Sequence, residues 1–503
     1  MSEVQNIRVA VRCRPLSKKE LGNKEKSIFS IKSGNVELRN PSDDKVSTFN
    51  FDRIWPDDSK QTEVWDFLGQ PMLDKCMEGF NGTVFAYGQT GSGKTFSMQG
   101  VQTDPELKGL IPRFTYRLFD RIVEEKEKDK NKLFLVTCSY FEIYNEVISD
   151  LLDPSSKKKG SASGLDVKEH PVLGVYVKGL QEIVVEGAPK MNDLIMQGMG
   201  NRHVAATAMN EESSRSHSVF TIKIHQKDAT DESKSMFSKV NLVDLAGSER
   251  AKSTGASGAT LKEGANINKS LSALGNVINA LVEQAKGKKK GVFIPYRNSK
   301  LTRVLQESLG GNSLTSMLAA LSPAAINYDE TLSTLNYAAR AKSIKLSAKK
   351  NEEASQVSKL NDEIAALKKA LAEMADGQGP GVPAAASGGG GGEVQLVSDP
   401  EAEEKFKAQI RELEAAMNDT WEEKQKLSAE KEAERKDMIN EQREALLRAQ
   451  EEREKRWQLI EEKDDVELSV RNVCDSVAEL PTNDWLSKVR SMLSLEQEIR
   501  EET

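Results

Sequence analysis

The chain has 503 residues, of which 38% are hydrophobic and 30% are charged, an apolar content that is low for a protein that is globular throughout. The net charge of −7 is unevenly spread, because residues 1–350 carry +9 and residues 351–503 carry −16. These values argue against one uniform core. They predict a basic first part that binds something anionic and an acidic second part that forms little core.

The cysteines and the N-terminus indicate a cellular setting. Cys13, Cys76, Cys138 and Cys474 form no C-x-x-C pair, which argues against a zinc site and against a disulfide framework. The first residues contain no apolar signal region, and no run is long enough to cross a membrane. We therefore expect a soluble protein in a reducing, intracellular compartment.

Residues 6–345 alternate between strand-like and helix-like stretches. Apolar, β-branched runs at Ile7–Val11, Leu133–Ser139, Val219–Ile224 and Lys239–Leu245 are typical of strands, and Asn266–Gln284 has a helical pattern. Such alternation predicts an α/β domain in which helices cover a central sheet.

The stretch VFAYGQTGSGKTFSM contains a phosphate-binding loop. Residues Gly88 to Thr95 fit the pattern G-x-x-x-x-G-K-[ST], in which Lys94 reaches the β- and γ-phosphates of a nucleoside triphosphate and the Thr95 hydroxyl binds Mg²⁺. A chance match in an ordinary loop is the alternative. The apolar strand before the loop and the helix after it argue against chance.

Two further motifs fit a nucleotide hydrolase. The run VNLVDLAGSER places Asp244 at the end of a strand as the acidic Mg²⁺ partner, Gly247 as a backbone donor to the γ-phosphate, and Glu249 nearby. The run NEESSRSH surrounds Arg215 with hydroxyl groups and an imidazole. We predict that Arg215 and Glu249 form an ion pair when both loops close over the nucleotide, although an exposed serine-rich turn is the alternative for the second motif.

Residues 283–305 form a basic cluster. Their sequence, EQAKGKKKGVFIPYRNSKLTRVL, has a single carboxylate, Glu283. The cations are Lys286, Lys288, Lys289, Lys290, Arg297, Lys300 and Arg303. Such a cluster suits an acidic protein polymer, but a nucleic acid or a merely solvated loop would also be compatible with it.

Taken together, these motifs resemble the kinesin motor domain. FAYGQTGSGKT, NEESSRSH and DLAGSER occur in the family's order, accompanied by RCRP and by GANINKSLSALGNVI, and the resemblance runs from about residue 4 to 350. It implies a microtubule-stimulated ATPase with a mixed, mainly parallel central sheet flanked by helices. It also implies ATP and Mg²⁺ at the site.

The resemblance assigns roles residue by residue. Lys94, Arg215, Gly247 and Glu249 would carry catalysis, and Thr95, Ser214 and Asp244 would bind Mg²⁺. Arg12, Arg14 and Pro15, with Phe96, would pack around the adenine. The nucleotide-binding set as a whole is Arg12, Arg14, Pro15, Gly88, Gln89, Thr90, Gly91, Ser92, Gly93, Lys94, Thr95, Phe96, Ser213 and Ser214. The basic cluster would contact tubulin.

Further segments are most similar to kinesin-3, the vesicle-transport class, notably EHPVLGVYVKGL and NDTWEEK. The family's neck linker corresponds to residues 341–353, where Ile344 would fill a docking pocket and Asn351 would latch the end. Lys349 and Lys350 stand where the family usually has apolar residues, so we expect weaker docking. The lysine insert is shorter than is usual for this class, and neither a forkhead-associated nor a pleckstrin-homology domain is recognisable.

We expect a motor domain at 1–340, the neck linker at 341–353, a neck coiled coil at 354–375, a flexible Gly/Pro/Ala-rich linker at 376–400, a charged helical or coiled-coil segment at 401–463, and an unassigned segment at 464–503. The neck seam also fits an amphipathic helix folded back on the head. The chain is then either a homodimer, formed through its coiled coils, or a self-inhibited monomer.

Three functions compete. The first is a plus-end-directed motor that carries an unidentified cargo or adaptor along microtubules in the cytoplasm, with neither nucleic acid nor a direct membrane-binding domain involved. The second is a kinesin-like regulator of microtubule ends that does not walk. The third, a structural tether with an inactive ATPase, is disfavoured because Lys94, Thr95, Arg215, Asp244 and Glu249 are all present.

Overall fold

The structure is a computed structural model, and it describes residues 2–153, 164–170, 174–205, 215–230, 235–249, 259–287, 292–352, 491, 492, 494 and 495. The chain divides into two compact units, Met1–Trp421 and Glu422–Thr503. In the second unit the four described residues are helical, and the Ser494 hydroxyl donates to the Ser491 carbonyl at 3.0 Å. The predicted neck coil, the linker, the charged segment and most of the final segment lie outside the described residues.

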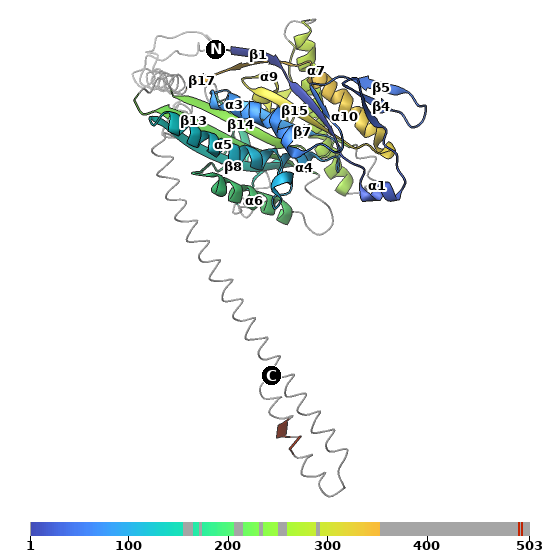
Figure 1. The fold of residues 1–503 in the computed structure, drawn as a ribbon, viewed down its shortest axis with the longest axis horizontal. Helices are drawn as coiled ribbons and strands as arrows, with labels where there is room; N and C mark the ends of the chain where they lie inside the picture. Colours follow the sequence, from blue (N-terminus) through green and yellow to red (C-terminus); the bar gives the residue numbers. More distant parts are fainter. Residues whose placement is uncertain are drawn as a thin grey trace, which may run out of the picture. The chain divides into compact units, whose positions relative to one another are not determined.

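A ten-stranded mixed sheet forms the centre of the first unit (Figure 1). Its main path runs β12 (Ile183–Val184), β8 (Lys132–Tyr144), β13 (His217–Asp228), β14 (Met236–Asp244), β7 (Gly82–Tyr87), β15 (Leu314–Leu321), β2 (Arg8–Cys13) and β6 (Arg53–Trp55). Two strands attach beside this path, β9 (Val147–Asp150) to β8 and β17 (Asn351–Glu352) to β14.

The sheet is mixed as expected, but parallel pairing is confined to one part of it. Strands β14, β7, β15, β2 and β6 are paired in parallel, whereas β12, β8, β13 and β14 are paired antiparallel. The expectation of a mainly parallel sheet therefore holds only for the part that contains β7. Connectivity explains only part of this pattern, because β8 and β9 follow each other through a short turn that permits only antiparallel pairing, whereas β8 and β13 lie far apart in the chain.

Helices cover both faces of the sheet. The α-helices of the described residues are α1 (Lys18–Gly22), α2 (Gln61–Val64), α3 (Gln70–Met77), α4 (Lys94–Met98), α5 (Leu110–Lys128), α6 (Ala188–Ala205), α7 (Ala259–Ala285), α8 (Lys300–Val304), α9 (Gln306–Gly310) and α10 (Tyr328–Ala341). Among the described helices, none has the length and apolar character needed to cross a bilayer.

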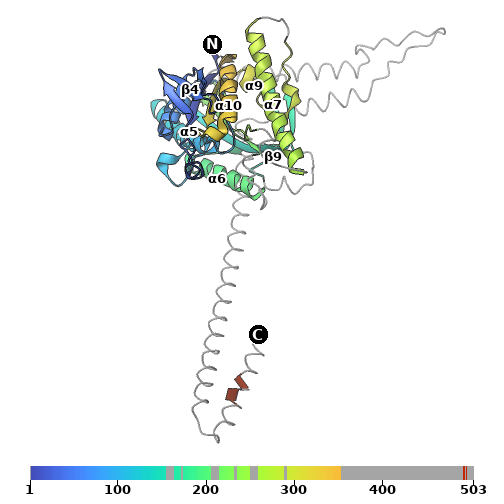
Figure 2. The same cartoon turned by 90° about the vertical axis from the view of Figure 1, so that its right-hand side faces the viewer.

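Strand β7 shows how the two faces arise. All six of its residues are buried, and the last four alternate between two hydrophobic clusters. Val84 and Ala86 belong to the cluster built with α3, α5 and α6, while Phe85 and Tyr87 belong to the one built with α7 and α10. Figure 2 shows α7 and α10 close together beside the sheet. Burial on both faces explains why this strand is a continuous apolar run.

Three smaller sheets accompany the central one in the described residues, and the third is the strand pair of the segment after α10, described below. The three-stranded one consists of β3 (Phe29–Lys32), β4 (Asn35–Arg39) and β5 (Val46–Phe49). Another is a hairpin of β10 (Asp166–His170) and β11 (Gly174–Lys178).

The segment after α10 is docked along the domain. Strand β16 (Lys345–Lys349) pairs antiparallel with β1 (Ser2–Asn6), so that Ser2 lies opposite Lys349. Ile344, Leu346 and Ala348 are buried. Every second residue of the strand therefore packs inward, as the alternation along a strand requires.

Hydrogen bonds of Asn351 fix the polar end of this segment to the domain. The Asn351 amide donates to the carbonyls of Gly79 (3.3 Å) and Phe237 (3.1 Å) and to the Asn81 side-chain oxygen (2.9 Å). Lys349 and Lys350 do not prevent docking, because the Lys349 side chain points to solvent and the Lys350 ammonium lies 5.8 Å from the centre of the Phe80 ring.

Candidate nucleotide-binding site

The loop between β7 and α4 has the backbone that a phosphate cradle needs. Gly88, Gly91 and Gly93 have positive φ angles of 149°, 73° and 99°. A Cβ atom on Gly88 would lie 2.2 Å from the Ala320 carbonyl oxygen, so a side chain there would displace the loop from β15. Gly93 precedes the first residue of α4 in a left-handed conformation. The glycines predicted from the sequence thus stand where their conformational freedom is required.

Lys94 lies folded inside this loop. Its side chain is buried, and its ammonium donates to the carbonyl oxygens of Gly88 (2.9 Å) and Gln89 (2.8 Å). Burial lowers the pKa of Lys94, and the negative charges of Asp244 and Glu249 oppose that shift. A phosphate group placed in the loop would offer this ammonium a charged partner in exchange for two neutral carbonyls.

Asp244 and Thr95 form an oxygen-rich pair at the end of β14. The Thr95 hydroxyl donates to Asp244 Oδ2 at 2.7 Å. Asp244 is only 1% exposed, and its Oδ1 has no hydrogen-bond partner within the described residues. A buried, unsatisfied carboxylate oxygen beside a hydroxyl is the donor set that suits Mg²⁺ and its water ligands. The residues present therefore fit the ion that the sequence predicted. The predicted Ser213 and Ser214 lie outside the described residues.

The segment after Asp244 packs directly on the phosphate loop. Glu249 accepts two hydrogen bonds from Thr90, one from its backbone N–H (2.8 Å) and one from its hydroxyl (2.5 Å). The Ser248 N–H donates to the Gly88 carbonyl at 3.1 Å, and a Cβ atom on Gly247 would meet the Thr90 hydroxyl at 2.2 Å. In this arrangement, both oxygens of the Glu249 carboxylate are hydrogen-bonded to Thr90. Arg215 lies half-buried at the start of the region that leads into β13, and its ion pair with Glu249 stays a prediction.

The predicted adenine-binding residues differ in their solvent exposure and in the contacts that they already make. The Phe96 ring is 40% exposed and Pro15 is exposed, so both are accessible to a base. Arg12 is buried, with its guanidinium 5.2 Å from the centre of the Phe96 ring, and it donates to Ser59, Gln61 and Ser97. Burial lowers the pKa of Arg12 to about 10. Arg14 contacts the loop itself, through its Nε and the Gly91 carbonyl at 2.6 Å.

Sequence reasoning missed Arg202. This residue of α6 is only 4% exposed and donates to Asp244 Oδ2 at 3.4 Å, to the Ser216 carbonyl at 2.9 Å and to the Ser218 hydroxyl at 3.2 Å. It thereby joins Asp244 to the first residues around β13. Only its position just before the serine-rich motif could have singled it out from the sequence.

His217 was part of a predicted motif but had no assigned role. Its Nδ1 accepts from the Ala246 N–H at 3.0 Å, and its Nε2 lies 2.7 Å from the Ser270 hydroxyl. Burial, with the charges of Arg202 and Lys94, lowers the pKa of His217 to about 3, so the imidazole is neutral at physiological pH. It ties the segment after Asp244 to α7.

The predicted basic cluster is partly neutralised within the chain. Arg297 and Arg303 lie 3.4 Å and 3.3 Å from Glu169, a residue of the β10–β11 hairpin. Lys300 donates from its ammonium to the Leu165 carbonyl at 3.0 Å, and Lys286 is exposed. The structure therefore places Arg297, Lys300 and Arg303 beside this hairpin. The predicted Lys288, Lys289 and Lys290 lie outside the described residues.

Comparison with known proteins agrees with this geometry. The family described as "Kinesin motor domain" matches residues 12–344. The kinesin-like protein KIF13A of Mus musculus is 43% identical over 438 residues, which cover 83% of this chain and 23% of that protein. KIF1B of Rattus norvegicus is 47% identical over 387 residues, covering 73% of this chain and 21% of that protein. The chain thus spans about a fifth of the length of these relatives, which are kinesin-3 proteins, as the sequence motifs predicted.

Solved structures are similar as well. A fast kinesin, whose structure was examined for its ATPase mechanism and microtubule interactions, is 45% identical, with a TM-score of 0.62 over 69% of this chain and 94% of that one. A KIF14 dimer in a two-heads-bound state, with AMP-PNP and a microtubule, is 44% identical, with a TM-score of 0.63 over 69% of this chain and 96% of that one. The chain belongs to the family of proteins that contain a kinesin motor domain.

Proposed function

We propose that the chain is a microtubule-stimulated ATPase and a plus-end-directed motor that transports cargo along microtubules. One observation carries the proposal: the phosphate loop, Asp244 and Glu249 form one connected site, and the segment after α10 is docked along the same domain. The docked segment favours a motor over a regulator of microtubule ends, because a segment that docks and undocks can move relative to the motor domain.

The chemistry that we propose relies on position and charge. The triphosphate of ATP lies in the glycine-rich loop, where the Lys94 ammonium binds its β- and γ-phosphates. Thr95, Asp244 and Ser214 would hold Mg²⁺, which would neutralise charge on the phosphates. Gly247 donates its backbone N–H to the γ-phosphate. No strong base is required, since phosphoryl transfer depends on orientation and on stabilisation of negative charge.

Glu249 is the residue whose partner has to change. In the structure it is held by Thr90. We propose that closure of the loops transfers Glu249 to Arg215, and that the resulting pair orients the attacking water. The nucleotide then decides which partner Glu249 has, which makes the pair a switch.

The proposed partner is the microtubule, whose acidic surface would contact Arg297, Lys300, Arg303 and the lysines from Lys286 onward. Support comes from the charge of this surface and from the microtubule complex of the similar KIF14 structure. A cytoplasmic location on the cytoskeleton and a homodimer formed through the coiled-coil segments belong to the same proposal.

The test is to measure ATP turnover with and without microtubules, and then to image single molecules on polarity-marked microtubules. The expected results are an ATPase rate that rises with microtubule concentration and runs toward plus ends. Stimulation without directional movement would instead support the regulator of microtubule ends. Absence of any stimulation would contradict both functions.

A further inference from the structure

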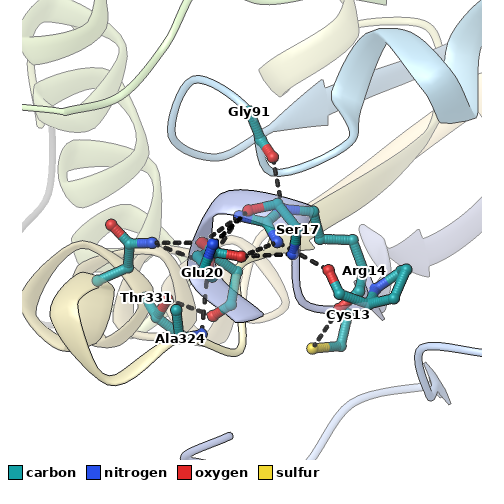
Figure 3. A network of polar contacts seen from close by, with 10 residues as sticks. Cys13, Arg14, Ser17, Glu20, Gly91, Ala324 and Thr331 are labelled. Carbon is teal, nitrogen blue, oxygen red and sulfur yellow. Dashed lines mark hydrogen bonds and ion pairs between the residues drawn. The ribbon is translucent and has the colours of Figure 1, made fainter. Parts of the chain in front are cut away.

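Arg14 is surrounded by a closed network of polar contacts (Figure 3). Its Nε donates to the Gly91 carbonyl at 2.6 Å, and Nη1 donates to the Pro15 carbonyl and to Glu20 Oε2, both at 2.7 Å. Nη2 donates to Glu20 Oε1 at 2.7 Å and to the Ser322 hydroxyl at 3.1 Å. A guanidinium has five N–H groups, and these five acceptors occupy all of them. Arg14 thus has no donor left for a nucleotide.

The other side of the network reaches the beginning of α10. Glu20 Oε1 accepts from the Asn327 amide at 3.3 Å, and the same amide donates to the Ser322 hydroxyl at 2.9 Å. The Thr331 hydroxyl, in the first turns of α10, donates to the Ser322 carbonyl at 2.9 Å. Gly91 of the phosphate loop is therefore linked to α10 through Arg14 and the residues that surround it.

A second contact joins α10 to the strand that carries the loop. The ring of Tyr87, the last residue of β7, stacks on Tyr337 of α10 with their centres 4.1 Å apart and their planes 2° from parallel. Both rings are buried. Helix α10 is consequently linked to the phosphate loop near its first residues and packs, through Tyr337, on the strand that precedes the loop.

Helix α10 leads directly into the docked segment. It ends at Ala341, and Ile344, which is 1% exposed, follows just before β16. The Ile344 carbonyl also accepts from the Ile7 N–H at 3.0 Å. A displacement of α10 along its axis would therefore move the residue on which docking of β16 depends.

From this geometry we infer that Arg14 is a positioning residue: together with Glu20 it couples the phosphate loop to α10, so that nucleotide binding and docking of β16 favour each other. The inference rests on the proposed function only in that the loop binds a nucleotide. An ion pair that merely stabilised the fold would need no bond to Gly91, whose carbonyl belongs to the loop that surrounds the phosphates. Coupling of this kind is reciprocal, so it can be measured from either side.

The experiment is a double-mutant cycle on the full chain without microtubules. The affinity for AMP-PNP with Mg²⁺ is measured for the wild type, for Ile344→Ala, for Arg14→Lys and for the double variant. Ile344→Ala removes the buried side chain that docks the segment. In the wild-type background we expect it to weaken AMP-PNP binding about five-fold or more, the usual lower range for coupled sites. In the Arg14→Lys background we expect it to have almost no effect.

Two controls keep the cycle decisive. Arg39→Lys is the same substitution in an exposed ion pair with Asp44, and it should leave the effect of Ile344→Ala unchanged. Glu20→Gln removes the partner of Arg14 without changing side-chain size, and it should abolish the coupling as Arg14→Lys does. It also replaces Arg14→Lys if thermal unfolding shows that this variant does not fold.

The outcomes separate the inference from the proposed function. Equal effects of Ile344→Ala in both backgrounds, or no effect in the wild type, would overturn the coupling through Arg14 while leaving an ATPase intact. A wild-type chain that bound no AMP-PNP would instead contradict the proposed nucleotide site. The cycle is measured without microtubules, so its result does not depend on whether microtubules stimulate ATP turnover.

Discussion

Glu249 is held by Thr90 in the structure, whereas the proposed mechanism pairs it with Arg215, and this difference makes it the most informative single residue. We predict that Glu249→Ala still binds ATP and microtubules but hydrolyses ATP roughly 10²-fold more slowly, because the attacking water loses the group that orients it. Turnover and nucleotide affinity are measured separately. The exposed Glu186→Ala is the control and should turn over normally. Normal turnover by Glu249→Ala would refute the assignment.

The ion pair of Glu20 with Arg14 should make the stability of the fold depend on pH. Its hydrogen bonds and ion pair with Arg14 lower the pKa of Glu20 from 4.5 to about 2, against an opposing effect of burial. A carboxyl group with a lowered pKa stabilises the fold fully above about pH 4.5, and this stabilisation is lost as the pH falls toward 2. A pKa lowered by this amount corresponds to a contribution to the free energy of unfolding on the order of 3 kcal/mol at neutral pH.

The matching measurement is the free energy of unfolding of the wild type and of Glu20→Gln between pH 7 and pH 3. The wild type should be the more stable by a constant amount down to about pH 4.5, and the difference should then shrink. A difference that stayed constant down to pH 3 would show that the ionised state of Glu20 does not contribute.

At the scale of elements, the docked segment depends on both burial and polar contacts. Asn351→Ala removes four hydrogen bonds from its end, three donated by the amide and one accepted from Asn312 at 2.8 Å, each worth about 1 kcal/mol net. We predict that gliding of microtubules over the variant is several-fold slower while ATP turnover without microtubules is nearly unchanged. Lys349→Ala is the control, because the structure uses the Lys349 backbone and leaves its side chain in solvent. Equal gliding by Asn351→Ala and the wild type would contradict the latch.

Local patterns in the sequence predicted the elements well. Buried strands such as β7 and β14 were predictable because continuous apolar runs have few other solutions in an α/β domain. The glycine-rich loop was predictable because its chemistry requires residues at fixed spacing. The antiparallel part of the sheet was not, since pairing between β8 and β13 depends on contacts between residues far apart in the chain.

The site was predictable to a similar extent. Lys94, Thr95 and Asp244 came from motifs, and the structure brings all three together. Apart from its position before the serine-rich motif, nothing in the sequence marks Arg202, because a single arginine in a helix has the same local pattern whether it faces solvent or a buried carboxylate. A similar limit applies to the partners of Arg14, which come from three parts of the chain: the neighbouring residues 15–20, Gly91 and Ser322.

At the scale of the whole molecule, the opposite charges of residues 1–350 and 351–503 are the dominant feature. If the acidic part covers the basic cluster, deletion of residues 376–503 should raise microtubule-stimulated turnover several-fold at low salt and less at high salt, since screening weakens attraction between exposed charges. The measurement is turnover against microtubule concentration at two ionic strengths. Unchanged turnover after deletion would exclude this form of inhibition.

The pairing of β1 with β16 has a mechanical consequence. The ladder begins at Ser2 and Lys349, and an ion pair between Glu3 and Lys75, 3.1 Å long, also ties strand β1 to α3. A backward pull on the chain after Asn351 would therefore load the Asn351 contacts first and then open the ladder one residue pair at a time, as a zipper opens. The force needed to open the ladder at any moment would be that of one residue pair rather than of all five pairs. The segment would therefore detach gradually instead of all at once.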